Sequence, residues 1–193
     1  MSLHPTLHYR ANSLDKSRIA PILWLYLLLF TVMVAVTTYT PVAEAQWQVN
    51  ENARSETGAL IRTAYTHNDA GYGLEVYKDS TAAIRLRFSL ANGLFGLLKD
   101  ACPTYQIDNA TAANRSINDG DCLSGDTWAE FILGHIQDNQ IESELLLAVL
   151  NGNTINFRFR LVNGDYREST ISLAGSKRSM TSVIGENIRI RPR

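Results

Sequence analysis

Strict alternation between apolar and polar side chains is the feature that most constrains the fold of this chain. It occurs in residues 84–90 and again in residues 155–161. A period of two places successive side chains on opposite faces of an extended strand. The apolar members are Ile84, Leu86, Phe88 and Leu90 in the first segment, and Ile155, Phe157, Phe159 and Leu161 in the second. Both segments therefore predict β-strands that bury one face.

Shorter segments with weaker patterns predict further strands. They are residues 47–49, 60–65, 73–77, 104–107, 128–134, 166–173 and 188–191. Residues that tolerate positive φ separate several of them, and the Asn163-Gly164 pair between two strands is a typical hairpin signal. The chain is therefore predicted to be mainly β, as an antiparallel β-sandwich with one or two short helices.

Two segments are predicted to be helical. Residues 141–150 place apolar side chains on one helical face, and we expect this face to pack on the sheets. Asp138 or Asn139 is the candidate N-cap of this helix, and Gly152 is its candidate C-cap. A second short helix is expected over residues 176–184.

The N-terminal region has the three parts of a secretory signal. A basic segment precedes the uncharged apolar residues 22–36, and Ala43-Glu44-Ala45 has the small-x-small form of a cleavage site. We expect residues 1–45 to be a signal peptide and residues 46–193 to form a single exported domain. The alternative is an uncleaved signal anchor with its hydrophobic part at residues 19–36. In both cases the domain lies on the non-cytoplasmic side.

The chain has two cysteines, Cys102 and Cys122, and both belong to the predicted exported domain. An exported protein meets an oxidising environment, in which an even number of cysteines usually pairs. No Cys-x-x-Cys spacing, which is typical of a redox-active pair, is present. We therefore predict one structural disulfide, which ties the polar segment between the cysteines to the sandwich.

Charge and motifs argue against several functional classes. The chain has 18 Lys and Arg against 19 Asp and Glu, so it lacks the basic excess that a nucleic-acid binder needs. The exported part has two histidines, His67 and His135, and neither lies in a cluster with metal-ligand spacing. No nucleophile elbow, phosphate loop or dinucleotide fingerprint occurs. We predict a non-enzymatic protein without a metal or cofactor; a hydrolase that uses His67 or His135 is the weaker alternative.

Four arginines in the two alternating segments are candidates for a binding surface. They are Arg85, Arg87, Arg158 and Arg160. If the two strands are near neighbours, these guanidinium groups could form a patch for an anion or an acidic partner, because guanidinium binds carboxylate and phosphate bidentately. The alternative is a solvated face on which acidic residues of other strands pair with the arginines. The acidic candidates are Glu75, Glu130 and Glu168.

Several short motifs follow one another in a distinctive order. They are Trp47 after the leader, Cys102, Cys122, the segment 128–134, the helix that ends at Gly152, the strands of Phe157 and Tyr166, and the segment 171–176. This order resembles the invasion-associated locus B family of bacterial periplasmic proteins. The resemblance covers roughly residues 100–185 and implies an exported β-sandwich without known catalytic residues, tied to the envelope and to host-cell interaction. It assigns no active site to this chain.

The leading hypothesis for the function is an exported β-sandwich that binds a protein or another envelope component in the periplasm of a Gram-negative bacterium. The alternative is an accessory subunit, anchored in the inner membrane and facing the periplasm, that docks on a larger integral membrane complex. No nucleic-acid partner is expected. Contact with the membrane is expected only through the N-terminal segment, if that segment stays uncleaved.

Overall fold

The computed structural model of the chain describes residues 47–53, 60–99, 101–115, 117–120 and 122–193. All of them belong to one compact unit, residues 43–193. The predicted leader, residues 1–45, lies outside the described residues. The secondary-structure elements discussed below therefore all belong to the predicted exported domain.

The larger of the two main sheets has six strands. They are β1 (Gln48–Ala53), β2 (Leu60–His67), β3 (Gly73–Lys78), β4 (Ala83–Ser89), β6 (Cys122–Ser124) and β7 (Trp128–His135). Their order in the sheet is β1-β2-β3-β4-β7-β6, and every neighbouring pair is antiparallel. The first strongly alternating segment thus forms β4, close to the middle of this sheet.

The smaller sheet has three antiparallel strands. They are β5 (Thr104–Ile107), β9 (Thr154–Arg160) and β10 (Tyr166–Ser172), in the order β10-β9-β5. The second alternating segment forms its central strand. A separate pair, β8 (Gln140–Glu142) and β11 (Arg189–Arg191), is parallel. This parallel pair is a departure from the purely antiparallel pattern expected from the sequence.

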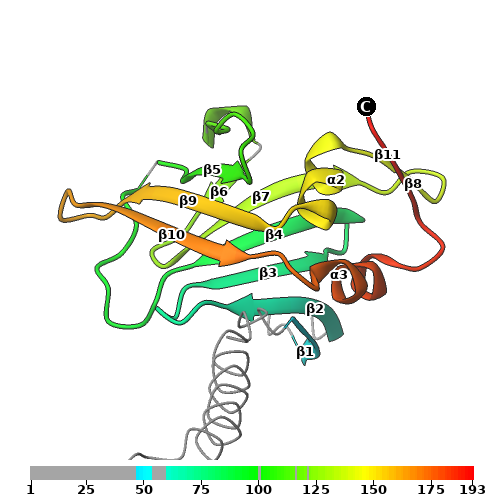
Figure 1. The fold of residues 1–193 in the computed structure, drawn as a ribbon, viewed down its shortest axis with the longest axis horizontal. Helices are drawn as coiled ribbons and strands as arrows, with labels where there is room; N and C mark the ends of the chain where they lie inside the picture. The colour runs from blue at the N-terminus through cyan, green and yellow to red at the C-terminus, as the bar shows by residue number, and fades with distance from the viewer. Residues whose placement is uncertain (1–46, 54–59, 100, 116, 121) are drawn as a thin grey trace, which may run out of the picture. The chain divides into compact units, whose positions relative to one another are not determined.

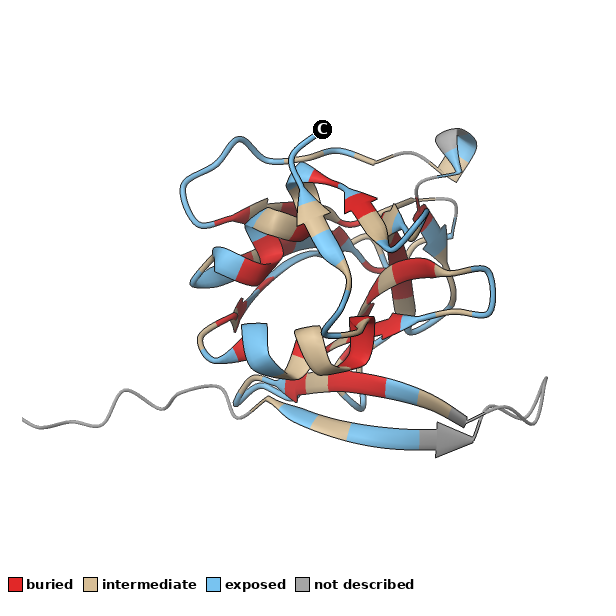
Figure 2. Cartoon of the chain, turned by 90° about the vertical axis from the view of Figure 1, so that its right-hand side faces the viewer, coloured by how far each residue is buried: buried red, intermediate tan, exposed pale blue. Residues whose placement is uncertain are grey.

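The two sheets pack face to face around a hydrophobic core. Phe88 of β4 and Phe157 of β9 stack across the interface, with their ring centroids 4.4 Å apart. The smaller sheet lies over the larger one, and the helices α2 (Glu144–Asn151) and α3 (Ser176–Ile184) complete the cover on the same side (Figure 1). Buried residues occur in the strands of both sheets and in both helices (Figure 2). The structure therefore confirms a mainly β, sandwich-like fold with two short helices.

The helix predicted over residues 141–150 begins later than expected. Its first residue is Glu144, and Ser143 is the N-cap, with its side chain accepting a hydrogen bond from Leu146 N. Ile141 belongs to β8 instead. The C-terminal prediction is confirmed, because Gly152 caps the helix through its N–H.

Asp138 and Asn139, the expected N-cap candidates, form the turn between β7 and β8. Both have positive φ, 49° and 58°, and the flanking Gln137 and Gln140 exchange backbone hydrogen bonds of 2.9 and 2.8 Å. Two successive residues with positive φ are the mark of a tight hairpin turn, which Asp and Asn tolerate. The capping prediction was wrong because these residue types also favour such turns.

The disulfide between Cys102 and Cys122 is present, with the two Cα atoms 6.3 Å apart. Cys102 precedes β5 of the smaller sheet and Cys122 begins β6 of the larger one, so the bond links the two sheets. A disulfide is compatible with an exported protein. Within the part of the chain that the structure describes, no helix is both long and apolar enough to cross a membrane.

Candidate binding surfaces

Arg85 and Arg87 lie on the outer face of the six-stranded sheet, because the residues that alternate with them, among them Phe88, point into the core. Arg85 Nε donates to Asp79 Oδ2 over 2.6 Å, and Arg87 Nε donates to Glu130 Oε1 over 2.7 Å. Arg85 Nη1 also lies 3.6 Å from Glu130 Oε2. Both arginines are therefore paired with carboxylates of the same domain.

Glu130 is the centre of this charged group, and it is only 5% exposed. The Tyr77 hydroxyl donates a hydrogen bond to it. The Arg87 guanidinium lies over the rings of Trp128 and Tyr77, 5.0 and 5.6 Å from their centroids. Burial alone would lower the pKa of Arg87, but the hydrogen bond with Glu130 and the negative charges around it raise that pKa. The group is thus a half-buried ion-pair network that links β3, β4 and β7.

Asp79 closes the turn between β3 and β4. Its Oδ1 accepts hydrogen bonds from the N–H and hydroxyl of Thr81 and from Ala83 N. Partial burial would raise the pKa of the Asp79 carboxyl, but the hydrogen bonds from Thr81, Arg85 and Ala83 outweigh burial and lower the pKa from 3.8 to about 2. This carboxylate is therefore a structural part of the turn.

Arg158 and Arg160 lie on the outer face of the smaller sheet. Arg158 Nη2 is 2.6 Å from Glu168 Oε1, and both side chains are more than half exposed. Arg160 instead stacks on Tyr166, 5.3 Å from the ring centroid, and its Nε donates to Gly164 O. Arg160 thus combines an exposed cation with an exposed aromatic ring.

The four arginines do not form one patch, which corrects the patch predicted from the sequence. Phe88 and Phe157 point toward each other, so the arginines that alternate with them, on β4 and on β9, lie on opposite outer faces of the sandwich. The alternative, cross-strand pairing with acidic residues, is observed for Arg85, Arg87 and Arg158, whereas Arg160 stacks on Tyr166. Glu130 pairs with Arg87 and Glu168 pairs with Arg158, while Glu75 stands opposite Arg87 in the register of β3 and β4.

Exposed apolar side chains define a different surface. Among the described residues, four large hydrophobic side chains are strongly exposed: Phe95 (62%), Leu123 (47%), Val162 (51%) and Tyr166 (70%). Three of them, Phe95, Val162 and Tyr166, belong to segments that lie side by side at one end of the sandwich. We call these three residues the end patch. Exposed apolar side chains on neighbouring segments are a typical sign of an interaction site, whereas isolated exposed apolar residues are not.

Backbone hydrogen bonds fix the two segments of the end patch against each other. Val162 N donates to Gly96 O over 2.9 Å, and Leu98 N donates to Arg160 O over 2.8 Å. Leu97 N donates over 2.7 Å to Asp126 O, which lies in the turn between β6 and β7 of the larger sheet. The loop that follows β4 and the turn between β9 and β10 therefore form one end of the domain, on the left of Figure 1, away from α3 and β11.

Two glycines make this arrangement possible. Gly164 has φ of +90° and donates its N–H to Leu161 O, which closes the hairpin turn that presents Val162. This turn confirms the hairpin predicted from the Asn163-Gly164 pair. A Cβ on Gly96 would lie 2.8 Å from Asp126 O, so the loop carrying Phe95 can pack this closely only with glycine at that position.

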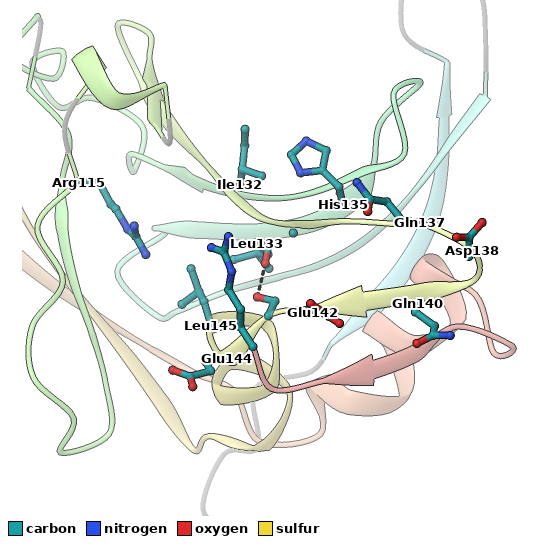
Figure 3. A pocket seen from close by; sticks show the side chains of 13 residues that line it. Arg115, Ile132, Leu133, His135, Gln137, Asp138, Gln140, Glu142, Glu144 and Leu145 are labelled. Carbon is teal, nitrogen blue, oxygen red and sulfur yellow. Dashed lines mark hydrogen bonds between the residues drawn. The ribbon is translucent and has the colours of Figure 1, made fainter.

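A polar pocket of about 660 Å³ lies at the C-terminal end of β7, between β7, β8 and the start of α2 (Figure 3). Its lining includes Arg115, His135, Glu142 and Glu144, so charges of both signs face the same space. The Ser143 hydroxyl, on the same wall, donates to Leu133 O and is satisfied within the protein. The mixed charge of this lining favours no particular ligand class.

The two histidines of the described residues, His67 and His135, lie far from each other in the larger sheet. His67 ends β2 opposite Gly73, which in turn pairs with Ser89, whereas His135 pairs with Ala83. Ser89 and Ala83 are the two ends of β4, so the histidines lie at opposite ends of the sheet. Within the described residues, no group of three or more His, Cys, Asp or Glu is placed to hold a metal ion.

Comparisons with protein-family models, with curated proteins and with solved structures gave no match. The fold therefore defines the class of protein: a mainly β domain of two facing sheets, joined by a disulfide.

Proposed function

We propose that this chain is an exported, non-enzymatic β-sandwich that binds a protein or another component of the bacterial envelope through the end patch. The gathering of three exposed apolar side chains, Phe95, Val162 and Tyr166, at one end of the domain carries this proposal. Burying them against a partner would remove apolar surface from water, which is the main driving force of association. The resemblance to the invasion-associated locus B family supports the same class of function.

The chemistry of the end patch suits a protein partner. Tyr166 and Arg160 form a stacked pair, and aromatic residues and arginine are enriched at the energetic centres of protein interfaces. Charged residues of both signs flank Tyr166 in the chain: Arg167 and Asp165 form an exposed ion pair of 3.2 Å. An apolar centre with a polar rim is the usual anatomy of such an interface.

Site-specific photo-crosslinking in the envelope of the source cell tests the proposal. A photoreactive amino acid replaces Phe95 or Tyr166 in the full chain, and the control places it at Ser80, an exposed residue in the turn at the opposite end of β4. We expect a discrete adduct from the first two positions and none from Ser80. The absence of any adduct at Phe95 and Tyr166, or the same adducts from Ser80, would contradict the proposal.

The apolar segment 19–36, which approaches the length needed to span a bilayer, favours a second candidate, an accessory subunit anchored in the inner membrane and docked on a larger complex. N-terminal sequencing of the protein isolated from cells separates the two candidates. A start at Gln46 supports a released periplasmic domain, and a start at or near Met1 supports the anchored subunit.

A further inference from the structure

The chain contains three Asn-Gly pairs, Asn92-Gly93, Asn151-Gly152 and Asn163-Gly164. In such a pair the backbone nitrogen of the glycine can attack the asparagine side-chain amide, because glycine offers no side chain to hinder the approach. The reaction requires a backbone N–H that is free to lose its proton and a peptide that can change its conformation. The hydrogen bonds of each glycine N–H therefore decide which pair reacts in the folded protein.

Two of the pairs are held by hydrogen bonds. Gly152 N donates to Ala148 O over 2.8 Å at the end of α2, and the Asn151 side chain bonds to Leu147 O and to Lys177 Nζ. Reaction at this pair requires the last turn of the helix to open.

The third pair along the chain is held in the hairpin turn. Gly164 N donates to Leu161 O over 2.9 Å, and both polar atoms of the Asn163 side chain bond to Asp165. Reaction at this pair requires the turn between β9 and β10 to open, which also breaks the backbone pairing of Leu161 with Asp165.

Asn92 and Gly93 are placed differently. Both are exposed, and within the described part of the chain neither the Gly93 N–H nor the Asn92 side chain has a hydrogen-bond partner. A Cβ built on Gly93 would meet no atom within 4 Å, so the surroundings of this peptide are open. The pair lies in the loop that presents Phe95.

We propose that Asn92 is a site of spontaneous deamidation in the folded protein. Hydroxide removes the proton from Gly93 N, and this nitrogen forms a bond to Asn92 Cγ. The Cγ–Nδ2 bond breaks, and the side-chain nitrogen takes a proton from water and leaves as ammonia, which regenerates the hydroxide. Water then opens the resulting succinimide at either carbonyl, which gives aspartate or isoaspartate at position 92. The net change is the exchange of ammonia for water, and no oxidant or cofactor takes part.

The product carries a new carboxylate three residues before Phe95. Isoaspartate also adds a methylene group to the backbone of the loop. Deamidation therefore changes both the charge and the geometry beside the end patch. This inference concerns the chemistry of the loop alone, and it stands whether or not the end patch binds a partner.

Peptide mapping by mass spectrometry tests the proposal on the full, oxidised chain, incubated in mildly alkaline buffer either folded or in denaturant. In the folded chain we expect Asn92 to convert at least about tenfold faster than Asn151 and Asn163, because each of these needs a local opening, and a tenfold difference corresponds to an opening free energy of about 1.4 kcal/mol. In denaturant the three pairs should convert at similar rates, because the protecting hydrogen bonds are gone.

Charge separation of the folded protein provides a second readout. Asn92→Gln should abolish the acidic form that accumulates with time, and the matched control Asn163→Gln should leave it unchanged. The proposal is overturned if Asn151 or Asn163 converts as fast as Asn92 in the folded chain. It is equally overturned if the folded chain shows no conversion at Asn92 while the denatured chain reacts.

Discussion

Phe88 and Phe157 stack with their ring centroids 4.4 Å apart, and neither ring is accessible to solvent. The two residues come from the centres of the two strongly alternating segments, so their contact joins the six-stranded sheet to the three-stranded one. It also fixes the orientation of both strands. Because these rings face inward, the arginines on either side of them face outward on opposite surfaces.

The first prediction concerns this contact. Phe157→Ala should lower the free energy of unfolding by about 3–5 kcal/mol, because it removes a fully buried ring and leaves a cavity between the sheets. The same substitution at Phe95 should change it by less than about 0.5 kcal/mol, because that ring is mostly exposed. Urea denaturation of both variants measures the difference. Similar losses in the two variants would contradict the packing described here.

A second prediction concerns the disulfide. Cys102→Ser or Cys122→Ser should lower the free energy of unfolding by about 2–4 kcal/mol and increase proteolysis between residues 108 and 121, because the bond closes this loop and links the sheets. The double variant should lose no more than either single one. Thiol titration of unfolded, unreduced protein is the direct check, and two free thiols per chain would show that the pairing is wrong.

The ion-pair network on the outer face leads to a third prediction. Glu130→Ala should lower the free energy of unfolding by about 3 kcal/mol, because it leaves the half-buried Arg87 without its carboxylate. Glu168→Ala removes the partner of the exposed Arg158 and should cost less than about 0.5 kcal/mol. Thermal and urea unfolding of the two variants compare them. Equal losses in the free energy of unfolding would contradict this prediction, because they would show that burial does not make the Glu130 pair more costly to break than the Glu168 pair.

Asp79 leads to a prediction on pH dependence. Its pKa is about 2 in the folded protein and 3.8 in the unfolded reference, so the folded state binds fewer protons between these values. The stabilisation is therefore complete above about pH 4 and is lost as the pH falls toward about pH 2; it amounts to about 1–2 kcal/mol. Asp79→Asn should be less stable than the parent at neutral pH, and the difference should shrink on acidification. A difference that stays constant with pH would contradict this assignment.

The strands that the sequence predicts best are those with one buried face. The segments around Phe88 and Phe157 show clear alternation because every second side chain enters the core, and the structure places both near the middle of their sheets. The disulfide was predictable from the number of cysteines and the expected compartment. Local patterns of this kind are visible without knowledge of the tertiary structure.

Features that depend on long-range packing could not be predicted. Alternation assigns Arg87 and Arg158 to polar faces, but it does not show that these faces point away from each other. Phe95 lies in a loop without periodicity, so only the backbone bonds of its neighbour Gly96 and of Leu97 place it at the hairpin end. The apolar run around Phe95, flanked by Gly93 and Gly96, was the one sequence signal of an exposed site in this loop.

Hydrogen–deuterium exchange of the full chain, with and without envelope fractions of the source cell, tests the central claim most directly, because it reports on every surface at once. The proposed function predicts that added protection is confined to residues 91–99 and 160–168, the two segments that carry the end patch. Protection that falls instead on residues 132–145 around the polar pocket, with the end patch unchanged, would contradict it.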